Sequence, residues 1–99
     1  MEKITKPKVK TLASGSNLLA KQMQANAGDL LPKHLANVES ILFIQEGECI
    51  FKIDGEDKQL KQGEALVVPA KTEHQIKAKT DNFKGIHFMP SDIEFQFFK

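Results

Sequence analysis

The 99-residue sequence has little of several features that would point to particular protein classes. It contains no tryptophan, no tyrosine and a single cysteine, Cys49, so an internal disulfide is impossible and a reducing compartment is expected. It has no apolar run of about 18 residues, and its start is charged rather than apolar, which argues against a membrane span and against export. We therefore predict a cytoplasmic protein that does not contact a membrane.

Charge and catalytic motifs are equally sparse. Fourteen basic side chains against thirteen acidic ones give a formal charge of +1, which is too small to indicate a nucleic-acid partner. The sequence has no GxGxxG, P-loop, GxSxG or CxxC motif. It therefore lacks the usual signatures of nucleotide binding, of hydrolysis by a nucleophile elbow and of dithiol chemistry. Lysines gather in residues 1–14, which we interpret as a basic arm or an edge strand.

What the sequence does contain is period-two alternation of apolar and polar residues. The clearest case is 48–54, where Cys49, Phe51 and Ile53 share one face, and Asp54-Gly55 then supplies the residues of a tight hairpin turn. Alternation recurs in later segments and no long helical stripe appears, so roughly eight short strands and an all-β fold are predicted. The expected inward residues include Leu42, Ile44, Cys49, Phe51, Ile53, Leu60, Val67 and Ile76.

Two blocks of sequence each run from a glycine to a histidine. In the first, Gly28 is followed after five residues by His34, within Leu31-Pro32-Lys33-His34. In the second, Gly63 is followed by Pro69-Ala70 and then by His74. These blocks resemble the two motifs of the cupin superfamily, and the chain is most similar to its very short, single-domain members.

The resemblance implies an antiparallel jelly-roll β-barrel. Residues 1–99 would form one cupin domain, with 15–99 as the barrel. Residues that match His34 and His74 approach each other at the barrel mouth in cupins and often hold a metal. Here Ala36 stands where the motif has a second histidine, and Ser40 stands where it has a glutamate. The resemblance therefore implies a degenerate site in which metal binding is weak or absent.

Three histidines are the candidate site residues. His34 and His74 are predicted to contact a small-molecule ligand and could weakly hold a divalent transition metal such as Zn, Ni or Fe. His87 shares a strand face with Phe83 and Met89 and would become the third member if that face is the inner one. Glu39 and Glu73 are poorer candidates, because strand parity turns the first away and the second lies in a turn.

Two functions stay open from the sequence. One is a cupin-like barrel that binds a small molecule with His34 and His74 at the mouth of its pocket. The other is a metal-dependent cupin enzyme, an oxygenase or isomerase, that uses the same pair and a third ligand. A metal-binding measurement on the purified protein would separate these alternatives.

The sequence also favours a homodimer. Residues 41–44 are apolar on both faces, and such strands need cover on both sides. If Ser40, Leu42 and Ile44 follow the cupin pattern and face inward, Ile41 and Phe43 face outward and need cover from another segment of this chain or from a second subunit. The phenylalanine-rich segment 95–98 is a candidate for the same surface.

Overall fold

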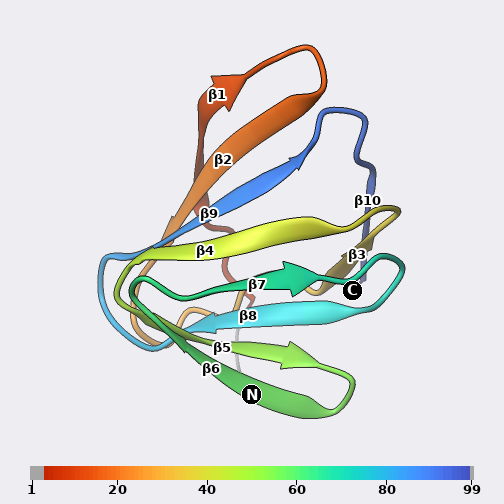
Figure 1. The fold of residues 1–99 in the computed structure, drawn as a ribbon. Coiled ribbons are helices and arrows are strands. Elements are labelled where there is room, and N and C mark those ends of the chain that lie inside the picture. Colours follow the sequence, from red (N-terminus) through yellow and green to blue (C-terminus); the bar gives the residue numbers. More distant parts are fainter. Residues whose placement is uncertain (1–3, 99) are drawn as a thin grey trace.

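The structure is a computed structural model that describes residues 4–98, and this part of the chain folds into ten strands without a helix (Figure 1). The strands are β1 (Lys8–Ser14), β2 (Leu18–Ala25), β3 (His34–Ala36), β4 (Ser40–Glu46), β5 (Glu48–Ile53), β6 (Glu56–Lys61), β7 (Ala65–Val68), β8 (His74–Ala78), β9 (Phe83–Pro90) and β10 (Phe95–Phe97). No helix of these residues is long and apolar enough to cross a bilayer.

The strands form two antiparallel sheets that face each other. One five-stranded sheet has the order β1-β2-β9-β4-β7, and the other has the order β10-β3-β8-β5-β6. Consecutive strands mostly lie in different sheets, as Figure 1 shows for the path from β7 to β8 to β9. This is the all-β antiparallel jelly roll that the sequence predicts.

Alternation along the strands explains the core. Cys49, Phe51 and Ile53 on β5 are buried, and the β5–β6 hairpin turns at Asp54-Gly55, where both residues have positive φ (51° and 75°). The other predicted inward residues are buried with them, apart from Val67; these are Leu42, Ile44, Leu60 and Ile76.

The prediction for Val67 is wrong. Val67 is 56% exposed, and Val68 is the inward residue at 2%. In the β4–β7 pair, Val67 lies opposite Ile41 and Val68 lies opposite Ser40, so Val67 shares the outer face of the sheet. The segment Ala65–Val68 is apolar at every position, and alternation therefore could not say which of its faces points inward.

The expectation that segment 95–98 shares a surface with Ile41 and Phe43 is also wrong. β10 pairs with β3, so Phe95 and Phe97 belong to the opposite sheet from β4. Phe97 is the register partner of His34, and the two phenylalanine rings lie against the His34 ring. The two rings therefore border His34 from the edge strand of this sheet, where Phe95 and Phe97 stay 40% and 62% exposed.

The chain before β1 also runs beside this interior. Ile4 forms a parallel bridge with Leu30, and the Thr5 amide donates a hydrogen bond of 2.8 Å to the Leu30 carbonyl oxygen. Leu30 in turn bridges to Lys77 on β8. Residues 4 and 5 are thus attached through Leu30 to β8.

Candidate functional site

His34 and His74 meet on the inner face of the β10-β3-β8-β5-β6 sheet. His34 begins β3 and His74 begins β8, and the two residues are register partners although they are 40 positions apart in the sequence. Opposed residues of an antiparallel pair point to the same face. Pro69 has no amide hydrogen and follows the end of β7, and a turn at Lys71 (φ 58°) returns the chain to His74.

The hydrogen bonds of this histidine pair use the proton of each ring and leave no proton between the two rings. His34 Nδ1 lies 3.1 Å from the Pro32 carbonyl oxygen, and His74 Nδ1 lies 3.0 Å from the Thr72 carbonyl oxygen. A carbonyl only accepts, so each Nδ1 carries its ring's single proton. The two Nε2 atoms lie 3.1 Å apart, and each therefore presents a lone pair to the other.

Burial keeps both rings neutral. Desolvation lowers the pKa of His34 and the pKa of His74, and it outweighs the opposite effect of the backbone hydrogen bonds. For His74, the neighbouring His34 lowers the pKa further. A third proton is thus disfavoured at neutral pH, so the gap between the Nε2 atoms suits a ligand N–H or O–H donor or a metal ion.

Aromatic rings hold the pair in place. Phe51 stacks on His74 with ring centroids 5.4 Å apart and an interplanar angle of 17°. Phe95 and Phe97 lie with their centroids 5.4 Å and 5.1 Å from that of His34. Phe51 is 1% exposed and shields one face of the His74 ring, while Phe95 and Phe97 stay 40% and 62% exposed beside His34.

His87 projects inward from the opposite sheet. It lies on β9 between Lys21 of β2 and Leu42 of β4, and it is 8% exposed. Its Nε2 is buried and has no hydrogen-bond partner among the described residues. Desolvation, with smaller contributions from His34 and His74, lowers the pKa of His87 to about 4. Such an orphaned buried nitrogen is uncommon in folded proteins and calls for a partner.

A cavity of about 640 Å³ separates His34 from His87, and both residues line it. Its wall is mostly apolar, and the residues that form this part include Met23, Leu31, Ile76, Met89, Phe95 and Phe97. Lys6 and Pro7 border it from the segment before β1. The volume falls in the range of about 300–1,000 Å³ that is usual for small-molecule pockets.

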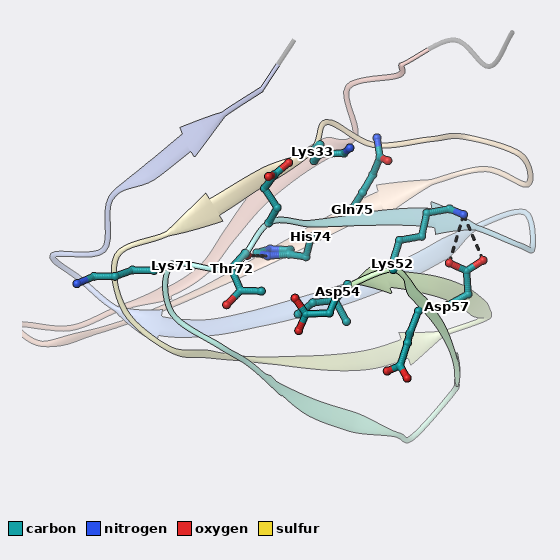
Figure 2. A pocket seen from close by; sticks show the side chains of 12 residues that line it. Lys33, Lys52, Asp54, Asp57, Lys71, Thr72, His74 and Gln75 are labelled. Carbon is teal, nitrogen blue, oxygen red and sulfur yellow. Dashed lines mark hydrogen bonds and ion pairs between the residues drawn. The ribbon is translucent and has the colours of Figure 1, made fainter.

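His74 does not line this cavity but borders a second hollow, which is polar and charged. This hollow measures about 660 Å³ and is shown in Figure 2, with His74 among polar and charged side chains from the β5–β6 hairpin and the loop before β8. Lys52 and Asp57 form an ion pair there, with 3.3 Å between Nζ and Oδ2. Lysines and carboxylates alternate around it, so it offers neither an apolar wall nor one sign of charge.

The donor set for a transition metal is incomplete. The two Nε2 atoms are spaced as adjacent ligands of one ion at about 2.0–2.1 Å would be, and their Nδ1 bonds are typical of metal-ligating histidines. Ala36 and Ser40 are buried but give no third nitrogen or carboxylate, while Glu39 and Glu73 are exposed. Within residues 4–98, no three histidine, cysteine or acidic side chains form a metal-binding group.

Reasoning from the sequence missed Lys21. It lines the cavity and is the register partner of His87 on the inner face of its sheet. Strand parity could have found it, because Lys21 lies two residues before the buried Met23 and therefore shares its face of the strand. Cys49 is buried as expected, and desolvation raises the pKa of its thiol to about 12, which excludes a reactive thiolate at neutral pH.

Comparison with known proteins identifies the family. The sequence pattern of the cupin domain matches residues 22–85, which is more than half of the chain. A cupin 2 conserved barrel domain protein from Leptotrichia buccalis is 30% identical and aligns over 87% of this chain and 41% of its own, with a TM-score of 0.76. The chain therefore belongs to the cupin family, as the two histidine blocks indicate.

More distant structures share the fold. KdgF from Halomonas sp. is 22% identical over 85% of this chain and 77% of its own, with a TM-score of 0.79. Salicylate 1,2-dioxygenase from Pseudoaminobacter salicylatoxidans, solved with gentisate, is 16% identical over 90% of this chain and 28% of its own, with a TM-score of 0.80. No curated protein sequence matches the chain.

The burial of His87 predicts a stability that depends on pH. Its pKa is about 4 in the folded protein against 6.5 ordinarily, so the unfolded chain binds more protons between these values. Stability is therefore complete above pH 6.5 and falls as the pH drops toward 4, by up to ~3 kcal/mol from this group. We expect urea unfolding to show a smaller loss between pH 7 and pH 4.5 in His87→Gln than in the parent protein.

The two proteins are compared by how steeply the free energy of unfolding changes with pH, because His34, His74 and the carboxylates titrate in both of them. Identical pH dependence in the two proteins would show that His87 is solvated or already protonated in the folded state.

Proposed function

We propose that this protein binds a small organic molecule between its two sheets, at a site built on His34 and His74. The observation that carries the proposal is the pair of Nε2 atoms 3.1 Å apart, between which no ring proton is left if each Nδ1 donates to its backbone carbonyl. A hydroxyl or amine group of a ligand that donates into this gap would satisfy them, while its apolar part fills the neighbouring cavity. Such a ligand would gain a hydrogen bond that is partly shielded from competing water.

A metal-dependent oxygenase or isomerase is the alternative, and the residues favour it less. A facial triad or a catalytic zinc site uses three protein ligands, and this site supplies two. Zn, Ni or Fe would be held by His34 and His74 alone, and it would then be weakly held.

The lone buried Cys49 suits a reducing compartment, and on this ground we propose a cytoplasmic location.

Metal titration tests the role of the two histidines. We expect nickel or zinc to bind the parent weakly, without a tight stoichiometric complex, and to lose at least about tenfold in affinity in His34→Ala and in His74→Ala. Affinity should fall as the pH drops below 6.5, because the imidazoles must be neutral to coordinate. Calorimetry measures both effects, with His87→Gln as the control that keeps the pair intact.

Equal affinity in the parent and in both alanine variants would place any bound ion elsewhere. A tight one-to-one complex in the parent would show that a third ligand completes the site, and it would favour the enzyme over the binding protein.

We also propose a homodimer formed through the outer face of the β1-β2-β9-β4-β7 sheet. Val67, Ile41 and Phe88 are neighbours across three strands on this face, and Ile41 and Phe88 are 46% and 45% exposed. Phe43 and Ile86 form the next row, where they are also register partners. Contiguous exposed apolar patches usually mark interfaces, and a twofold pair is the commonest way to cover one.

Light scattering at micromolar concentration tests the dimer. We expect a mass of twice the 11.1 kDa of one chain for the parent and of one chain for Ile41→Lys. Phe97→Lys is the matched control, because Phe97 is 62% exposed but lies on the other sheet, and this variant should stay dimeric. A monomeric parent would refute the dimer, and a dimeric Ile41→Lys would move the interface to another surface.

A further inference from the structure

The charge of the cavity between the sheets has one sign. Lys6 and Lys21 line it, and none of the lining residues in the described chain is aspartate or glutamate. The sequence as a whole is nearly balanced, with 14 basic and 13 acidic residues, so this bias is local. The polar hollow beside His74 shows the contrast, because lysines and carboxylates line it together. The cavity therefore attracts an anion in a way that the polar hollow does not.

Lys21 and His87 form a donor pair on one wall of this cavity. They are register partners in the β2–β9 pair and point to the same inner face, so their Cβ atoms are about 5 Å apart. His87 Nε2 is buried without a partner and can donate when it carries the ring proton. The Lys21 ammonium is a donor with a full charge. The chain contains no arginine, so a lysine must supply any strong cation here.

The remainder of the wall suits an apolar body. Met23 lies two residues from Lys21 on the same face of β2, and Met89 lies two residues from His87 on the same face of β9. Phe95 and Phe97 line the opposite side beside His34. Flexible methionines and aromatic rings adapt to flat or irregular apolar groups.

We infer that the ligand is a small monocarboxylic acid with an apolar body, whose carboxylate lies between Lys21 and His87. This inference rests on the proposed function, because it names the ligand class of the same cavity. One ammonium and one imidazole N–H match the single charge and two oxygens of a carboxylate. The apolar body then extends between Met23, Met89 and the phenylalanines toward His34, where a hydroxyl or amine group would reach the unprotonated nitrogens.

Matched acids and amides test the inference. The probes are benzoate, 3-phenylpropanoate and 5-phenylpentanoate, each with its primary amide, which keeps the shape and removes the charge. Binding is measured by NMR from the methyl signals of Met23 and Met89. We expect at least one acid to bind the parent about tenfold or more tightly than its amide, because hydrogen bonds between charged groups are the stronger ones. This preference should shrink at high salt.

Single substitutions test which side chain supplies the positive charge that favours the acid over its amide. Lys21→Met should bring the acid down to the affinity of its amide, while the affinity of the amide stays the same and shows that the cavity is intact. His87→Leu should also reduce the preference. Lys10→Met is the control, since Lys10 lies on β1 opposite Gln22, on the outer face of the same sheet, and it should keep the full preference.

The outcomes separate the two claims. If acids and amides bind the parent equally, the carboxylate assignment is overturned while the proposed binding function stands. The same holds if the preference survives Lys21→Met. If no acid or amide shifts the Met23 and Met89 signals, the cavity does not receive small molecules, and the proposed function and the inference fall together.

Discussion

The contact between two imidazole nitrogens is the constraint on which the site depends. It exists because β3 and β8 pair in the register that sets His34 opposite His74. The carbonyl groups of Pro32 and Thr72 then occupy both Nδ1 protons, which leaves two lone pairs 3.1 Å apart. In water such nitrogens would find solvent donors. Inside the sandwich, where burial lowers both pKa values, they need a donor or an ion, which a ligand, a water molecule or a metal would supply.

The jelly roll places a different wall opposite the histidine pair. One sheet presents hydrogen-bond acceptors, the Nε2 atoms of the histidine pair. The other sheet presents donors, Lys21 and the unpartnered His87. The apolar cavity between them is bordered by methionines and phenylalanines. A molecule that is apolar in its middle and polar at both ends would satisfy both walls.

Alternation in the sequence predicted much of the fold, and its failures have physical causes. It oriented β5 and β8 correctly, because polar residues mark one face of each, whereas β4 is apolar on both faces of 41–44 and was oriented by the cupin motif. It failed for Val67, because β7 is apolar throughout and carries no such mark. The two glycine–histidine blocks indicated the family and both histidines. Which sheet receives β10, and which residue faces His87, follow from pairing between distant strands, and no local pattern encodes that pairing.

The tautomeric state of the histidines tests the account most directly. Nitrogen-15 NMR of the imidazole side chains at pH 7.5, in protein free of ligand and metal, distinguishes protonated from unprotonated ring nitrogens. We expect His34 and His74 both to carry their proton on Nδ1 and to show an unprotonated Nε2. An Nε2–H tautomer or an imidazolium in either ring would supply the missing proton, and it would contradict the claim that this pair awaits a donor from a ligand.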